Sequence, residues 1–308
     1  MPNKEIQYID ARSFQRPLAE LAETIALKVQ REAVKTVKPG FLAIDVYVMI
    51  RHVLKTYELF FYINADERRQ NDSAWHVGFS VAALPLVRCM IDSLYNITML
   101  LDDPANAYKF RASGYRQSLE AIAKDEARYG GDPTMDAYIA SRREFIGQSM
   151  RADGTTIDEV SEATLWPTMS AYLRTKEGVP LTPHQSFLKE LTYGFWQEYS
   201  GIAHSTFQGL MRTATFYSPR DVPHEKRDEF DEAVDAMISM HLKRVVGVLL
   251  CVLTEVQAHF RFEGARINQR LHRAWDAVIA AAEIRELYDL RYKKLMEDRG
   301  LNRETPDA

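Results

Sequence analysis

Residues 230–260 have the sequence FDEAVDAMISMHLKRVVGVLLCVLTEVQAHF, in which apolar side chains recur in steps of three and four. The stripe begins at Phe230, continues through Ile238 and Val245, and ends at Phe260. A period of three and four over this length places the apolar side chains on one wide face of an α-helix. The stretch therefore predicts a long helix packed on a core, and it favours an all-α protein.

The same period extends from this stretch through most of the chain. Helices are expected over residues 18–37, 41–63, 74–101, 104–129, 133–150, 168–174, 185–215 and 265–295. Pro85 either kinks the third of these or starts a new helix, because its ring blocks a helical hydrogen bond. We expect a single all-α domain over residues 1–308, a bundle of eight or nine helices with no sheet. A loop is expected at 66–72 and an irregular insertion at 151–184.

Composition excludes several other classes of protein. Fourteen glycines and twelve prolines are few for the many tight turns of an all-β fold. Thirty-nine basic and 43 acidic side chains give a net charge of −4, which excludes a globally basic nucleic-acid binder but not a local basic patch. Cys89 and Cys251 lie in apolar runs, and two cysteines exclude a disulfide framework or a cysteine-built zinc site. We expect both in the core.

No stretch of the sequence is expected to change the compartment of the protein. Residues 1–17 lack the apolar segment of a signal peptide. The most apolar stretch, Val245–Leu253, falls well short of the ~18 residues that indicate a membrane span. We therefore expect a cytoplasmic protein that has no membrane partner.

Familiar catalytic and cofactor motifs do not occur. No histidine follows a glutamate by three positions, and no two histidines stand four apart, so the helical di-iron and zinc-protease patterns are missing. The sequence also lacks the phosphate-binding loop of nucleotide hydrolases and the Gly-x-Ser-x-Gly turn of α/β-hydrolases. We expect neither a metal site nor a cofactor.

Polar residues inside two apolar helices form the main candidate site. Arg88, Asp92 and Asn96 recur every four residues and share one face of their expected helix. A second group follows more than a hundred residues later: Tyr199, Ser200 and His204. One interpretation is structural, in which these groups satisfy one another between helices. The functional interpretation makes Arg88 an anion binder and His204 an acid/base group in a cleft.

These two groups also carry a family resemblance. The run from Leu86 to Pro104, with Asp102-Asp103-Pro104 at its end, resembles an uncharacterised bacterial all-helical family, the domain of unknown function numbered 5677, and so does Tyr199-Ser200-x-x-x-His204-Ser205. The resemblance covers residues 43–210. It implies an all-α bundle similar in style to HEPN domains, which are helical modules of prokaryotic defence and toxin systems. It implies no established reaction.

HEPN nucleases provide a second, weaker set of candidate residues. They cleave RNA without metal, with an arginine, a polar residue directly after it, and a histidine four to six positions beyond. Arg266 and His272 have this spacing, but Ile267 stands where the polar residue is expected. Arg266, Arg270 and Arg273 share a helical face and could bind an anion, although such a run is more often a solvated surface.

Two functions follow from these observations. The first is a non-enzymatic regulatory or interaction protein that acts through a homodimer or a protein partner; it predicts that Arg88, Asp92, Ser200 and His204 are buried and mutually bonded. The alternative is a HEPN-type metal-independent ribonuclease or toxin effector with RNA as its partner. It predicts an exposed arginine–histidine pair, most simply in a dimer groove that admits single-stranded RNA.

Overall fold

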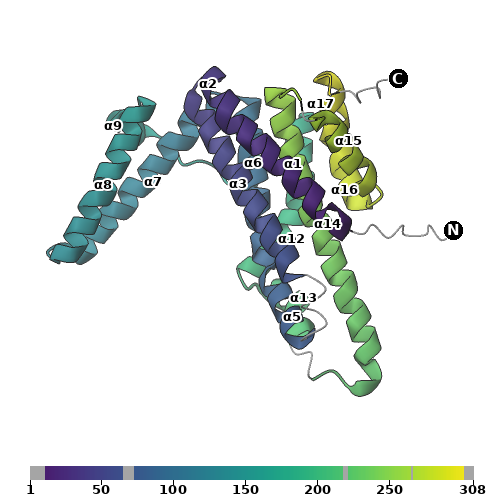
Figure 1. Ribbon diagram of the computed structural model, residues 1–308. Coiled ribbons are helices and arrows are strands. Elements are labelled where there is room, and N and C mark those ends of the chain that lie inside the picture. Colours follow the sequence, from purple (N-terminus) through teal and green to yellow (C-terminus); the bar gives the residue numbers. More distant parts are fainter. Residues whose placement is uncertain (1–10, 65–72, 218–220, 265, 302–308) are drawn as a thin grey trace.

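The computed structural model describes residues 11–64, 73–217, 221–264 and 266–301. All regular structure in these ranges is helical, and no strand occurs among them (Figure 1). The all-α prediction is confirmed, with a number of helices near the expected one. The loop expected at 66–72 lies outside the described residues.

The long helix α14 (Arg227–Phe260) packs on the core, as its periodicity predicts. Helices α3 (Gly40–Ile63) and α6 (Leu84–Asp102) pack on it from one side, and α1 (Gln15–Lys28) also contacts it. Every residue from Arg244 to Ala258 is buried. A helix that is buried on all sides needs apolar side chains on all sides, which explains the continuous apolar run in its second half.

Pro85 starts a new helix. Helix α5 (Ser73–Ala82) ends before it, and Pro85 occupies the first turn of α6. A proline is tolerated there because the amide nitrogens of the first turn have no partner within the helix. Ala83, between the two helices, keeps right-handed helical backbone angles, and α6 packs along α3.

The stretch 185–215 is not one helix, contrary to our expectation. The structure divides it into α11 (Pro183–Leu191), the π-helix η3 (Thr192–Trp196), α12 (Gln197–Ala203) and α13 (Phe207–Tyr217). The chain turns sharply after His204, where Ser205 takes a φ of 50°. A β-carbon on Gly209 would lie 2.3 Å from the Gly201 carbonyl oxygen, so the close approach of α12 and α13 requires glycine.

The expected helix 265–295 is also divided. Its parts are α15 (Ile267–Val278), α16 (Ala282–Leu287), the π-helix η6 (Tyr288–Tyr292) and α17 (Lys293–Asp298). Ile284 packs 3.2 Å from the position that a β-carbon on Gly247 of α14 would occupy. The break before α16 accompanies this contact between Ile284 and α14, and the alanines around residue 281 do not indicate a break in the sequence.

Helices α7 (Asn106–Tyr129) and α8 (Pro133–Asp153) form an arm that projects from the main body (Figure 1). The arm has its own small core, composed of Ile122, Ile139, Ile146, Met150 and Val160. Arg111 joins it to the body, because its guanidinium binds Asp45 of α3 at 2.7 and 2.9 Å and Asp153 at 2.5 Å.

The irregular insertion expected at 151–184 contains two short capped helices. They are α9 (Ile157–Glu162) and α10 (Met169–Arg174), and the second matches the helix expected at 168–174. The side chain of Thr156 caps α9 and that of Thr168 caps α10. These bonds satisfy backbone amides at the helix starts, which gives a glycine- and proline-rich stretch a defined path.

Two helical stretches of the described chain are long and apolar enough to cross a membrane by length and composition alone: Val77–Asp102 and His224–Phe260. More than half of the most apolar window of each is buried inside the protein, and the core helix of a soluble protein passes the same test. The cytoplasmic location stays a prediction.

One cysteine departs from expectation. Cys251 is buried in α14 as predicted, but Cys89 is exposed on α6. Cys89 directly follows Arg88 in the sequence, and its place on the helix turns it toward solvent instead of toward α14. The apolar residues on both sides of Cys89 in the sequence do not indicate whether its side chain faces solvent or α14.

Candidate functional site

The polar stripe of α6 lies where α12 packs against that helix. Arg88, Asp92 and Asn96 are all half-buried there, one turn apart. Each is bound by a different residue from a later part of the chain. The stripe therefore binds segments of the same chain that lie 70 to 116 residues away in sequence.

Arg88 and His204 are in direct contact. Arg88 Nη1 lies 2.5 Å from His204 Nε2, and the guanidinium carbon stands 5.0 Å from the centre of the Trp196 ring. Because arginine can only donate, His204 Nε2 is the acceptor in this contact. The Arg88 side chain keeps 22% of its surface exposed, and His204 is exposed.

Asp92 completes this group. Its Oδ1 accepts a hydrogen bond of 2.7 Å from Trp196 Nε1, and its Oδ2 lies 3.6 Å from Arg88 Nε. Burial raises the pKa of Asp92, and the Trp196 hydrogen bond and the Arg88 charge offset only part of that rise. Arg88 Nε is buried and has no hydrogen-bond partner in the described part of the chain. We call Arg88, Asp92, Trp196 and His204 the Arg88 site.

Trp196 is the member of the site that sequence reasoning missed. It lies at the end of the π-helix η3, and single π-turns are frequent at functional sites. Trp196, Ser200 and His204 stand four residues apart, so an inspection of that stripe for aromatic residues would have found it. Its attachment to α6 could not be deduced, because Trp196 and Asp92 are 104 residues apart.

The predicted polar cluster is divided between different places. Tyr199 is buried on another face of α12, where its hydroxyl lies 2.7 Å from Nδ1 of His241. Asn96 accepts a bond of 2.9 Å from Trp166 Nε1, which holds the segment before α10. Ser200 is half-buried, and its carbonyl oxygen accepts the His204 amide at 3.0 Å. Only Arg88, Asp92 and His204 come together.

Tyr199 belongs to a buried network that we call the His241 site. Arg244 Nη1 lies 3.5 Å from the Tyr199 hydroxyl and 2.9 Å from a carboxylate oxygen of Glu198. Burial lowers the pKa of His241 to about 3, with a further contribution from the positive charge of Arg244. His241 is therefore a neutral histidine buried in α14.

The weaker candidates in α15 do not form a site with one another. Arg270 Nη2 binds the backbone oxygen of Pro17 at 3.2 Å, and His272 Nε2 lies 2.6 Å from the backbone oxygen of Leu301. These bonds attach α15 to both ends of the described chain. Arg266 and Arg273 are exposed, and no contact between Arg266 and His272 occurs. The arrangement is that of a solvated helix with two structural anchors.

The Arg88 site can bind an anion and exchange a proton at one place. The Arg88 side chain is 22% exposed, and His204 is exposed at the end of α12. The described residues contain no group of three or more histidine, cysteine or carboxylate side chains that could hold a metal ion. Comparisons with family models, with curated proteins and with solved structures found no match to this chain.

Proposed function

We propose that this chain is a non-enzymatic interaction protein that binds another folded protein through an apolar surface on α3, α5 and α13. Nine large apolar side chains are exposed on these three helices, which contact one another in the order α3, α5, α13. They are Ile44, Val48, Leu59 and Tyr62 on α3, Phe79 on α5, and Phe207, Leu210, Met211 and Tyr217 on α13. We call them the α3–α5–α13 surface.

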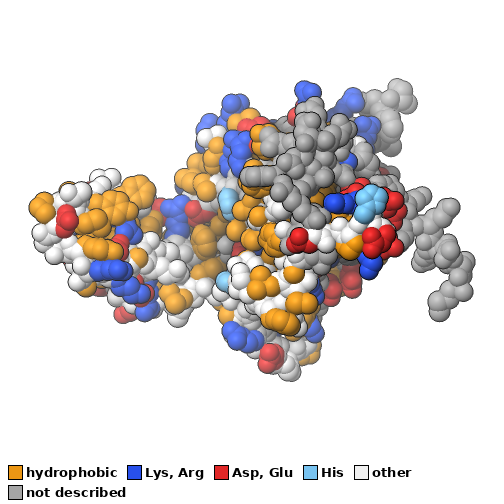
Figure 2. Space-filling model, turned by 90° about the horizontal axis from the view of Figure 1, so that it is seen from below, with side chains coloured by type: hydrophobic (Ala, Val, Ile, Leu, Met, Phe, Trp, Pro, Cys, Tyr) orange, Lys and Arg blue, Asp and Glu red, His pale blue; other side chains and the backbone are white. Residues whose placement is uncertain are grey.

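The concentration of these residues supports binding to a protein. Single exposed apolar residues are normal, whereas clusters of them mark interaction sites. The most exposed member is Phe207, at 78%, only three residues after His204. Apolar side chains gather on the underside of the main body in Figure 2. The Arg88 site lies beside this surface and would supply directional contacts at its edge.

The test compares two phenylalanines of similar exposure. Phe207→Glu places a charge on the α3–α5–α13 surface, and Phe145→Glu, at a position 70% exposed on the arm, is the matched control. We expect sedimentation at rising concentration to detect self-association, or cross-linking in cells to retain a partner protein. Phe207→Glu should weaken the association detected in either assay by at least about tenfold. Equal effects of the two variants, or no association in either assay, would contradict the proposal.

Metal-independent RNA cleavage is the second candidate, favoured by the contact between Arg88 and His204. His204 would take the proton of a ribose hydroxyl, and Arg88 would stabilise charge on the phosphate. A phosphate that binds Arg88 would also release His204 Nε2 from its present bond, which frees the lone pair for proton transfer. Asp92 opposes this function, because its carboxylate lies beside the place where the phosphate would bind.

Cleavage can be tested directly with total RNA and a chelator. Under this second candidate, His204→Ala abolishes metal-free cleavage, and His272→Ala, whose ring is bound to the Leu301 backbone, leaves the rate unchanged. No cleavage by the unaltered protein would remove the candidate. The family resemblance would place either function in a bacterial defence or toxin system, which stays a prediction.

A further inference from the structure

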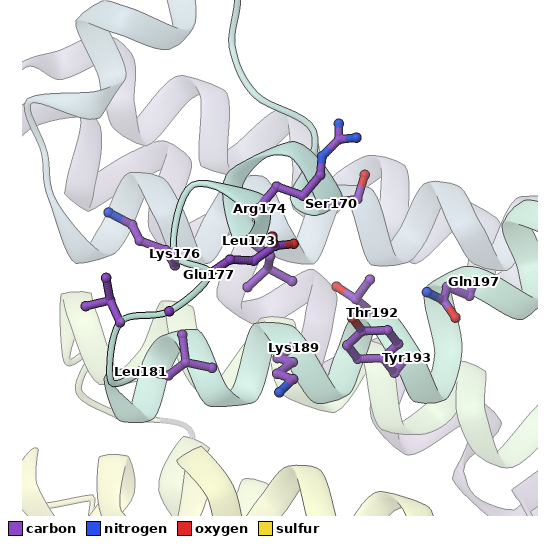
Figure 3. A pocket seen from close by; sticks show the side chains of 12 residues that line it. Ser170, Leu173, Arg174, Lys176, Glu177, Leu181, Lys189, Thr192, Tyr193 and Gln197 are labelled. Carbon is purple, nitrogen blue, oxygen red and sulfur yellow. The ribbon is translucent and has the colours of Figure 1, made fainter.

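A cavity of about 370 Å³ lies between the α10–α11 loop and the π-helix η3 (Figure 3). This volume is within the range of small-molecule sites, roughly 300–1,000 Å³. Leu173 and Leu181 contribute apolar surface to it, and Ser170, Thr192 and Gln197 contribute polar atoms. The cavity is separate from the Arg88 site and from the α3–α5–α13 surface, although η3 also carries Trp196.

The walls of the cavity are held in place by local bonds. Thr182 and Gln185 form a reciprocal cap at the start of α11. Gln185 also donates to the Tyr172 hydroxyl at 3.4 Å, which ties α11 to α10. Gly178 has a φ of 79°, which only glycine adopts readily, so the loop between the helices has a defined turn. A preformed cavity saves a ligand the entropy cost of ordering its site.

The charge of the cavity favours an anion. Arg174, Lys176 and Lys189 line it against the single carboxylate of Glu177, an excess of two positive charges. In Figure 3 the three basic side chains point in different directions, Arg174 upward, Lys176 to the left and Lys189 downward. No carboxylate of the described residues lies within ion-pair distance of Arg174 or Lys189, and both side chains are exposed. Their long stems can turn toward a shared anion.

The remaining side of the cavity favours an apolar or aromatic group. Tyr193 stands there with 60% of its surface exposed, and Gln197 lies beside it in Figure 3. The exposed tyrosine ring, which lies beside Thr192 in Figure 3, offers a face for a planar ring. We propose that this cavity binds a small phosphate monoester whose organic part is apolar or aromatic. Such a dianion matches the excess of two positive charges.

Calorimetric titration of the full chain with phenyl phosphate tests this site, with inorganic phosphate and phenol as the two halves of the probe. We expect phenyl phosphate to bind more tightly than either half. Lys189→Glu should weaken binding at least about tenfold, and Tyr193→Ala about fivefold. The matched controls are Lys109→Glu and Tyr138→Ala, which alter exposed residues on the arm and should leave binding unchanged.

Three results would overturn the assignment. The first is that phenyl phosphate releases no heat of binding. The second is that it binds both cavity variants, shown by circular dichroism to be folded, as tightly as the unaltered protein. The third is that inorganic phosphate binds as tightly as phenyl phosphate, which would leave no role for the Tyr193 face. None of these results bears on the α3–α5–α13 surface, because the experiment changes no residue of that surface.

Discussion

Helix α12 separates two arginine–histidine pairs that differ in burial. At the Arg88 site the two side chains touch directly, and both retain contact with solvent. At the His241 site the Tyr199 hydroxyl stands between His241 and Arg244, and all three are buried. The same residue types therefore occur within a few ångströms of one helix in two different environments.

The difference shows how burial decides what such a pair can do. Arg244 is neutralised by Glu198 and covered by the rings of Phe195 and Tyr199, so its charge is used inside the fold. His241 is held neutral by burial and by the adjacent Arg244 charge. Arg88 has a nearby carboxylate only at 3.6 Å and keeps donors for an outside group. The buried pair serves stability, and the exposed pair is the one available for binding.

The largest expected difference concerns stability. Arg244→Met should lower the free energy of unfolding by about 3 kcal/mol, because it leaves Glu198 partly buried with Arg212 as its remaining partner at 3.7 Å. Arg88→Met is the matched variant and should cost less than ~1 kcal/mol, since its ion pair is half-exposed. Urea denaturation measures both. Equal costs would show that burial does not distinguish the two sites.

The next effect is the pH dependence of the His241 site. Because its folded pKa is lowered to about 3 from 6.5, the unfolded chain binds more protons between these values. The stabilisation is complete above pH 6.5 and is lost as the pH falls, by ~2 kcal/mol at pH 5. Urea denaturation at several pH values should show a smaller dependence in His241→Gln. An unchanged dependence would mean that His241 is protonated in the folded protein.

A smaller effect is expected at Trp196. Trp196→Phe keeps an aromatic ring beneath Arg88 but removes the indole donor to Asp92. The loss of one hydrogen bond to a half-buried carboxylate should cost about 1 kcal/mol of unfolding free energy. Trp166→Phe removes the equivalent donor to Asn96 and serves as the comparison. A much larger loss of unfolding free energy in Trp196→Phe than in Trp166→Phe would show that the Arg88 site mainly stabilises the fold.

The smallest effect on stability is expected for His204. His204→Ala should change the unfolding free energy by less than ~0.5 kcal/mol, because the imidazole is exposed at the end of α12. The same variant is expected to weaken partner binding, measured by sedimentation or cross-linking, since it removes a polar group beside Phe207. A large loss of stability would place His204 with His241 as a structural histidine.

Part of the site could be predicted from the sequence. The spacing of Arg88 and Asp92 placed them on one helical face, and His204 was named as the acid/base group that would act with Arg88. Trp196 was missed because the candidates were chosen for polar side chains, although Trp196 stands four residues before Ser200 on the same stripe. Tyr199 was grouped with His204, although the five-residue separation points the two side chains to different faces of α12.

The sequence by itself determined the all-α class and the long, largely buried helix α14, because helical periodicity is a local property that each stretch carries independently. Only the tertiary structure decided that 185–215 is divided, that Cys89 faces solvent, and that Arg88 meets His204. The last of these depends on contacts between segments far apart in the chain, such as Trp196 with Asp92, and the division of 185–215 depends on the close approach of Gly201 and Gly209. Packing against neighbours, which no local pattern encodes, selects among the helical arrangements that the sequence allows.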